Sequence, residues 1–238
     1  MALNDGHRER MRRRYLKEGL DNFEAHEVLE LLLFYVIPRG NVNHIGHRLI
    51  NRFGSLAGVF HAKYEELMNI EGIGEHAALY LKLIPDVCRR YLLSSVQDKG
   101  IMPLSNSAVA HEYLAPYFVG RTVETLYAVC MNNAGIPVEC AYISEGTSNA
   151  TQVDVRKIVE AVIRNNAVAV ILCHNHPDGI ARPSPEDISM TRKVKDILDA
   201  MGVILLDHLI LVNDDFVSFR DSINMEDGQK KPETAGQE

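Results

Sequence analysis

The sequence predicts two folded regions of different class, a small all-α domain followed by an α/β domain in which strands and helices interleave. Between about Glu24 and Leu93 the apolar residues recur at helical spacing, with glycines between them. Beyond the polar stretch 94–100 the pattern changes to short apolar runs typical of strands. The chain has 238 residues, of which 46% are hydrophobic and 24% charged, so it has the composition of a folded protein with one or two domains.

The first domain is expected to cover residues 1–98, and the segment around Gly72, Ile73 and Gly74 resembles the turn of a helix-hairpin-helix. Backbone N–H groups at the start of the following helix can hold a DNA phosphate without reading bases. Against DNA binding, Glu71 and Glu75 flank the hairpin where a phosphate would lie, and such hairpins also serve only to pack helices. Weak, nonspecific DNA contact through residues 72–76 therefore remains one of two interpretations.

Five arginines lie between residues 8 and 14, so DNA binding is also considered for the N-terminus. They could bind phosphates, or they could solvate the exposed face of a first helix. Residues 1–100 carry 14 Lys and Arg against 13 Asp and Glu, and the remainder carries 11 against 19. The net charge of −7 argues against a protein that coats nucleic acid.

The second domain is expected to cover residues 101–223, with a disordered polar tail at 224–238. Asn132 to Gly135 form a turn signal that makes the first two strands a hairpin. The predicted strands are 123–132, 136–144, 167–173 and 203–212, and the predicted helices between them are 153–165 and 184–201.

The apolar runs and the cysteines indicate in which cellular compartment the protein is expected. The longest apolar runs, 31–37 and 167–173, are too short for a membrane span, and the N-terminus does not read as a secretory signal. We therefore expect a cytoplasmic protein. The four cysteines, Cys88, Cys130, Cys140 and Cys173, are well separated and fit reduced, buried thiols better than disulfides or a thiolate metal site.

The chemically most informative segment is 167–187, where a strand ends in His174, Asn175 and His176. Residues two apart on a strand point to the same side, so both imidazoles can face one point beyond the strand end. Asp187 follows at the start of the next helix and can supply a third ligand. Two histidines and one aspartate with an open fourth position are typical of a catalytic zinc site.

Each part of this pattern also has a structural interpretation. The stretch from Ser184 to Asp187 is a good helix start, with an N-cap serine, a proline at N1 and a carboxylate at N3. The H-x-H pair alone is a weak signal. The conjunction of the strand end with the helix start favours metal binding. Cys173 is not expected to be a fourth ligand, because on the strand it points away from the histidines.

His174, His176, Ser184 and Asp187 match the JAMM signature of the MPN/JAB metalloproteins, H-x-H, seven residues, then S-x-x-D. The chain resembles the bacterial RadC-like branch over nearly its whole length, including the helix-hairpin-helix-like region. The resemblance implies a mixed β-sheet flanked by helices, of the MPN/JAB, cytidine-deaminase-like kind. The segments that carry it are HNHP (174–177), PSPEDI (183–188), SEGTSNA (144–150), VRKIVEAV around Arg156, and DHLIL (207–211). Asp178 departs from the serine usual in this branch and lies outside the ligand set.

The family pattern also requires an upstream glutamate as general acid/base. We assign it to Glu124, which shares a strand face with apolar neighbours where an ionised carboxylate is costly without a task or a partner. Glu139 and Glu145 are the competitors, and a solvated strand entry is the alternative for Glu124. Asp207 and His208 are expected either to orient a ligand or to pair internally, and a structural role is the preferred interpretation for His208.

The resemblance thus implies a zinc-dependent hydrolase, a metallopeptidase that cleaves amide or isopeptide bonds of a protein or peptide substrate. Zn²⁺ would polarise the carbonyl, Glu124 would move the proton, and Ser184 would donate to the oxyanion. The competing interpretation is a DNA-associated repair or recombination accessory protein with a structural metal. Structural zinc usually takes four protein ligands, so a three-ligand site favours the hydrolase. The sequence predicts neither the substrate nor the oligomeric state.

Overall fold

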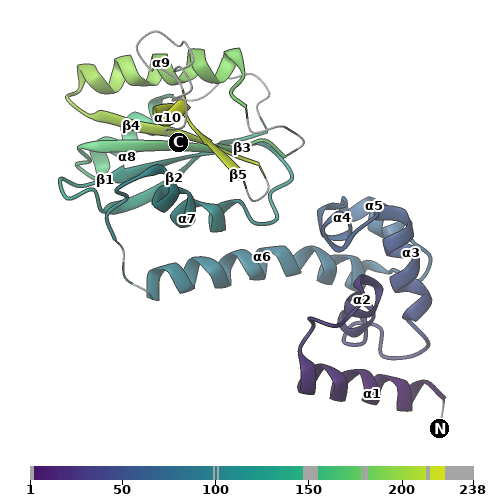
Figure 1. Cartoon of the computed structure of the whole chain (residues 1–238). Coiled ribbons are helices and arrows are strands. Elements are labelled where there is room, and N and C mark those ends of the chain that lie inside the picture. The colour runs from purple at the N-terminus through teal and green to yellow at the C-terminus, as the bar shows by residue number, and fades with distance from the viewer. Residues whose placement is uncertain are drawn as a thin grey trace, which may run out of the picture. The chain divides into compact units, whose positions relative to one another are not determined.

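A five-stranded mixed sheet forms the centre of the C-terminal region in the computed structural model (Figure 1). The strands lie in the order β2-β1-β3-β4-β5; β3 and β4 run parallel, and the other neighbouring pairs run antiparallel. Their bounds are β1 Thr125–Met131, β2 Pro137–Glu145, β3 Ala169–Asn175, β4 Ile204–Val212 and β5 Asp215–Ser218. The structure describes residues 3–98, 100, 102–146, 155–177, 179, 182–212 and 215–222.

Helices cover both faces of this sheet. The helix α7 (Ser107–Phe118) packs on one face, while α8 (Val155–Arg164) and α9 (Pro185–Ala200) pack on the other. The short helix α10 (Phe219–Ser222) follows β5. Every residue of β1 and of β3 is buried, because each of these central strands sends alternate side chains into the two apolar layers.

The predicted mixed sheet with flanking helices is confirmed, and the differences lie at the ends of elements. The strand predicted at 167–173 runs on to Asn175, and β1 begins at Thr125, one residue after Glu124. The helices predicted at 153–165 and 184–201 correspond to α8 and α9, with residues 153 and 154 outside the described residues. The helices α7 and α10 and the strand β5 were not predicted from the sequence. The predicted disordered tail lies outside the described residues.

The chain divides into two compact units, Met1–Cys88 and Arg89–Glu238. The first is helical, as predicted, and its core includes the fully buried Leu29, Leu49 and Leu81. The last of its helices continues to Asp98 through the polar stretch that was expected to separate the two regions. The helices are α1 Leu3–Glu18, α2 Ala25–Leu33, α3 Asn43–Phe53, α4 Leu56–His61, α5 Tyr64–Met68 and α6 Glu75–Asp98.

The helix-hairpin-helix-like turn predicted around Gly72 lies between α5 and α6, and Gly72 has a φ of +96° in it. A side chain at this position would be strained, because L-residues rarely adopt that conformation. Glu71 pairs with Arg48 at 2.8 Å, and the guanidinium of Arg48 also donates to the Glu71 carbonyl at 3.0 Å. Of the two acidic residues expected beside a phosphate, Glu71 and Glu75, the first thus forms an ion pair with an arginine of α3.

Arg8 fits neither expectation for the N-terminal arginines, because it is buried. Its guanidinium donates to the carbonyls of Phe34, Ile37 and Gly40 at the end of α2 and in the following turn, at 3.3, 2.8 and 2.9 Å. A cation suits the carbonyl end of a helix, so Arg8 anchors α1 to α2.

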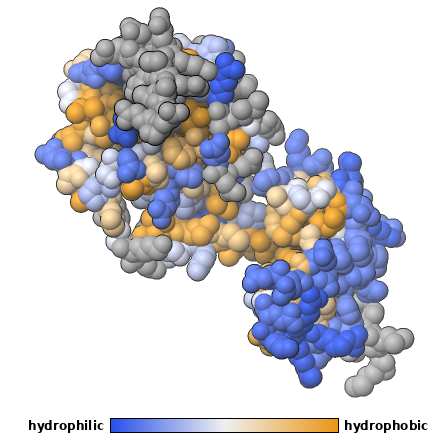
Figure 2. All heavy atoms as spheres, viewed as in Figure 1, coloured by the Kyte–Doolittle hydropathy of each residue, from blue (hydrophilic) through white to orange (hydrophobic). Residues whose placement is uncertain are grey.

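Figure 2 shows mostly hydrophilic side chains over the N-terminal unit and apolar side chains along α6. The exposed apolar residues of α6 include Leu79, Leu83 and Val87. Within the described residues, no helix is both long and apolar enough to cross a membrane.

Candidate metal centre

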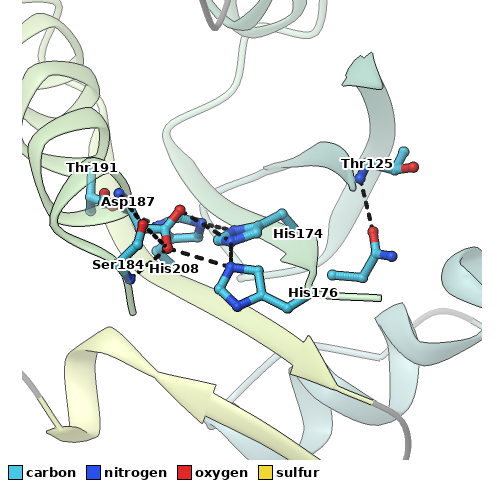
Figure 3. A network of polar contacts seen from close by, with 8 residues as sticks. Thr125, His174, His176, Ser184, Asp187, Thr191 and His208 are labelled. Atoms are coloured by element: carbon cyan, nitrogen blue, oxygen red, sulfur yellow. Dashed lines mark hydrogen bonds and ion pairs between the residues drawn. The ribbon is translucent and has the colours of Figure 1, made fainter. Parts of the chain in front are cut away.

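Three ionisable side chains converge beyond the end of β3 (Figure 3). The Nε2 atoms of His174 and His176 lie 2.8 Å apart. The carboxylate of Asp187 places Oδ1 3.2 Å from the Nε2 of His174 and Oδ2 3.4 Å from the Nε2 of His176. One donor atom of each residue therefore faces a common point.

The sheet and α9 together produce this convergence. His174 is the sixth residue of β3 and points to the same face as Leu172, the face on which α9 packs. His176 follows two residues later and keeps the same side. Asp187 stands in the first turn of α9, at the end nearest these histidines. The two histidines of the strand end and the aspartate of the helix start thus lie close together, as the sequence predicted.

The donor set fits a metal ion of the zinc class. With zinc–nitrogen distances of 2.0–2.1 Å, tetrahedral ligand atoms lie about 3.3 Å from one another. The two Nε2 atoms lie 2.8 Å apart, and Asp187 Oδ1 lies 3.2 Å from the Nε2 of His174, so these two separations are close to that value. His174 and Asp187 are buried, and His176 is the most exposed of the three, so the centre opens to solvent on the His176 side.

Ser184 and Asp187 form a reciprocal helix cap as well as part of this group. The Ser184 hydroxyl accepts from the backbone N–H of Asp187 at 3.0 Å and donates to Asp187 Oδ2 at 2.6 Å, while the Ser184 N–H also donates to Oδ2 at 2.8 Å. The helix cap predicted from the sequence is therefore present, and it leaves Asp187 within the group that could hold a metal ion. Because Oδ2 receives both bonds, Oδ1 is the freer oxygen for a metal.

The electrostatics of Asp187 follow from the same contacts. Burial alone would raise the pKa of this carboxyl, but hydrogen bonds from His174, His176 and Ser184 outweigh burial and hold the pKa well below its ordinary value. Asp187 is thus ionised, as a metal ligand must be.

Glu124 lies beside the centre and not on the strand proper. It is half-buried and follows the parity of Leu126 in β1, which pairs directly with His174. Burial raises the pKa of Glu124; the charge of Asp187 adds to this effect, and His174 and His176 oppose it. A carboxyl whose pKa is raised next to two imidazoles suits proton transfer.

The two competing glutamates point elsewhere. Glu139 pairs with Cys130 near the opposite end of β1 and binds Arg164 at 2.7 Å. Glu145 lies at the near end of β2, but its carboxylate pairs with Arg121 at 3.2 Å, and Arg121 also donates to Tyr127 on the α7 face of the sheet. Glu139 shares the His174 face but lies at the far end of the strands, so Glu124 is the one candidate that lies both on this face and at the His174 end.

His208 is fully buried and contacts His174 directly, so its contacts fit both the structural role and the alternative that it orients a ligand. Its Nε2 lies 2.8 Å from the Nδ1 of His174, and its Nδ1 lies 2.6 Å from the hydroxyl of Thr191 in α9. The neighbouring Asp207 instead pairs internally, accepting from the Ser218 hydroxyl at 2.6 Å and from the backbone N–H of Arg220 at 2.9 Å. Adjacent residues of β4 alternate between faces, which explains why the two residues differ.

Asn175 also lies at this strand end and was not predicted as a functional candidate from the sequence. Its side chain accepts from the backbone N–H of Thr125 at 2.8 Å and donates to the carbonyl of Val123 at 3.2 Å. It therefore holds the backbone on both sides of Glu124. A carboxamide at the end of an otherwise apolar strand needs buried hydrogen-bond partners. This feature of the sequence could have pointed to Asn175.

The cysteines are all free thiols, and none belongs to this centre. Cys173 is buried in the layer under α7, on the opposite face from His174, as predicted. Cys130 is buried and Cys140 partly buried, but Cys88 is exposed, so the expectation of four buried thiols is wrong for Cys88. Its position on α6 presents it to solvent instead of to the helical core.

The sequence of this chain matches two protein-family models and several known proteins. The model of the RadC-like JAB domain matches residues 104–225, and that of the UPF0758 N-terminal domain matches residues 6–79. The chain belongs to the UPF0758 family. UPF0758 proteins of Fusobacterium nucleatum, Coprothermobacter proteolyticus and Rhodobacter capsulatus are similar to it, with 34%, 30% and 30% identity. These alignments cover 91%, 88% and 88% of this chain and 95%, 90% and 97% of the relatives.

The family resemblance drawn from the H-x-H and S-x-x-D pattern is thereby confirmed. In this UPF0758 chain the RadC-like JAB domain carries His174, His176 and Asp187 as a group that could hold a metal ion. The same domain match covers all five strands and the helices that flank them.

Proposed function

We propose that this UPF0758 protein is a zinc-dependent hydrolase that cleaves amide or isopeptide bonds in a protein or peptide substrate. The observation that supports this most is the size of the ligand group. Among the described residues it contains two histidines and one carboxylate, with no cysteine. Structural zinc sites are usually closed by four protein ligands, whereas catalytic sites keep one position for water or substrate.

Different residues have different roles in the proposed reaction at this position. His174, His176 and Asp187 would hold the metal, which when bound supplies a Lewis acid that polarises a carbonyl and makes water reactive at neutral pH. Glu124 would take the proton from the attacking water and return it to the leaving nitrogen. Its raised pKa favours this exchange, because a base that is too weak would not accept the proton.

Ser184 as oxyanion donor stays a prediction. Its hydroxyl hydrogen is donated to Asp187 at 2.6 Å, so an oxyanion could receive it only if the hydroxyl turned away from Asp187. The contacts support another task for Ser184, which is to orient the Asp187 carboxylate.

Metal analysis of purified variants tests the assignment of ligand and base. We expect close to one zinc per chain in the wild type and in Glu124→Gln, because the glutamate is assigned to water and not to the metal. Asp187→Ala and the double variant His174→Ala/His176→Ala should lose the metal. Less than a tenth of an equivalent in zinc-supplemented wild type, or retention by Asp187→Ala with loss from Glu124→Gln, would show that these roles are wrong.

Activity is the second arm of the test. Peptide and isopeptide-linked substrates would be screened with the wild type, with Glu124→Gln as the matched, metal-loaded control. We expect hydrolysis to fall by roughly 10²- to 10⁴-fold in this variant, the usual size of a general-base contribution. Equal rates for the two proteins would contradict the role of Glu124.

A further inference from the structure

We propose that His208 and Thr191 form a directed hydrogen-bond chain that fixes the orientation and the tautomer of His174, so that its Nε2 lone pair faces the metal position. The inference rests on the metal site of the proposed function and adds two positioning residues to it. The chain runs from His174 Nδ1 to His208 Nε2 at 2.8 Å, from His208 Nδ1 to Thr191 Oγ1 at 2.6 Å, and from Thr191 Oγ1 to the Asp187 carbonyl at 2.6 Å (Figure 3).

The last bond sets the direction of all the others. A backbone carbonyl can only accept, so the hydroxyl of Thr191 donates to Asp187 and must accept from the Nδ1–H of His208. A neutral imidazole protonated at Nδ1 carries its lone pair on Nε2. His208 therefore accepts from the Nδ1–H of His174, so Nε2 is the ring nitrogen of His174 that faces His176 and Asp187 and is left for a metal.

The surroundings of His208 keep its ring neutral and fixed in place. It has no exposed surface, and the ring of Phe219 stacks on it at 4.7 Å with an interplanar angle of 23°. A charged imidazolium without any contact with water is costly, so burial favours the neutral ring. A second proton on this ring would force the Nδ1 of His174 to become the acceptor and would move the lone pair away from the metal position.

The chain also connects two ligands that stand on different elements. It starts at His174 on β3, passes through His208 on β4, and ends at the backbone of Asp187 in the first turn of α9. The spacing between the histidine and the carboxylate is thus held by three hydrogen bonds and not only by the contact between the two side chains. Such outer partners of metal-bound histidines typically change metal affinity by 10- to 100-fold when they are replaced.

The affinity for zinc, measured by competition with a chelator, tests the proposal. Thr191→Val keeps the shape of the side chain and removes the hydroxyl, and we expect its zinc Kd to rise roughly 10- to 100-fold. Thr191→Ser is the matched control, because it restores the hydroxyl, and its Kd should stay within about threefold of the wild type. His208→Gln, which keeps one acceptor and one donor, serves as the second variant. Thermal unfolding of the metal-free proteins checks that each variant is folded.

Long-range proton–nitrogen NMR spectra of the histidine rings show which ring nitrogen carries the proton. A residue that only fills space would not change this assignment when it is replaced. In metal-free wild type we expect both His174 and His208 to be protonated at Nδ1, and in Thr191→Val we expect this assignment to be lost for His208. Protonation of His208 at Nε2 in the wild type, or a folded Thr191→Val whose zinc Kd stays within twofold, would overturn the proposal. Failure of the wild type to bind zinc would instead refute the proposed function, while the ring spectra would still decide whether the chain exists.

Discussion

The side-chain oxygen of Asn175 accepts a hydrogen bond from the buried backbone N–H of Thr125 at 2.8 Å, across the pair of strands β3 and β1 (Figure 3). Its amide group donates to the carbonyl of Val123 at 3.2 Å. The residue between these two backbone groups is Glu124. Asn175 itself stands between His174 and His176, so one strand end orders both the candidate metal-ligating histidines and the backbone that carries the proposed base.

Asn175→Ala should loosen the backbone at Glu124. The N–H of Thr125 is buried, and the loss of its acceptor costs about 1–3 kcal/mol, so hydrogen exchange at this amide should accelerate about tenfold or more. Asn175→Asp is the control, because it retains an acceptor oxygen and should keep most of the protection. Zinc content should remain near that of the wild type in both variants. Unchanged exchange in Asn175→Ala would show that Asn175 does not hold this segment.

Ser184→Ala should weaken both the start of α9 and the metal site. Removal of an N-cap side chain costs about 1 kcal/mol of unfolding free energy. The Asp187 carboxylate would also lose the bond from the hydroxyl at 2.6 Å and keep only the one from the backbone N–H at 2.8 Å. Urea unfolding of the metal-free protein measures the first effect, and chelator competition measures the second. Ser184→Thr keeps the hydroxyl and should behave like the wild type in both assays; an equal loss in the two variants would contradict this account.

The convergence of the candidate metal ligands was predictable because it depends on two local rules. The period of a strand places His174 and His176 on one side, and a capping sequence places Asp187 in the first turn of a helix. Each rule needs only a few consecutive residues. The prediction of the four longer strands succeeded for the same reason, since alternating apolar runs bounded by turn residues are local signals.

The partners of these residues were not predictable in the same way. His208 reaches His174 because parallel pairing places His174 beside Ile210 and Leu172 beside His208, a register that no local pattern contains. The burial of Arg8 depends likewise on carbonyls at the end of α2. The helix α7 lacks a clear apolar stripe and contains Pro116, and β5 has only four residues, so their own sequences gave little signal.

The thiols should differ sharply in reactivity. Cys88 is exposed, whereas burial raises the pKa of Cys130 to about 11 and raises that of the fully buried Cys173 well above its ordinary value. Because the thiolate is the reactive form, one thiol per chain should react rapidly with an aromatic disulfide at pH 8 in the native protein. Cys88→Ser should remove this rapid phase, and denaturant should expose the remaining thiols. A rapid phase that persists in Cys88→Ser would contradict the assignment.

DNA binding, if the N-terminal unit has it, should be weak, steeply dependent on salt and indifferent to sequence. The groups expected to contact phosphates are partly occupied, since Arg8 binds carbonyls and Arg14 pairs with Glu27 at 3.0 Å. Contacts confined to phosphates carry no sequence information and release counterions. Electrophoretic shift titrations of two unrelated duplexes at two salt concentrations measure this, with the charge-reversal variant Arg10→Glu expected to bind more weakly. Tight binding that distinguishes the duplexes, or that survives high salt, would refute the prediction.

The raised pKa of Glu124 predicts that this residue destabilises the metal-free protein at neutral pH. Between the ordinary glutamate pKa of about 4.3 and the raised native value, the folded state binds more protons than the unfolded state, so stability falls as pH rises through this window and is constant above it. Glu124→Gln cannot ionise and avoids this loss. Its unfolding free energy in urea, with a chelator present, should equal that of the wild type below pH 4 and exceed it increasingly up to a plateau near neutral pH. A variant that is less stable than the wild type at pH 7, or a difference that does not change with pH, would mean that the carboxyl is not held in the environment described for it. The expected pattern would indicate that the fold retains an unfavourable ionised group beside the metal centre, as a residue kept for proton transfer requires.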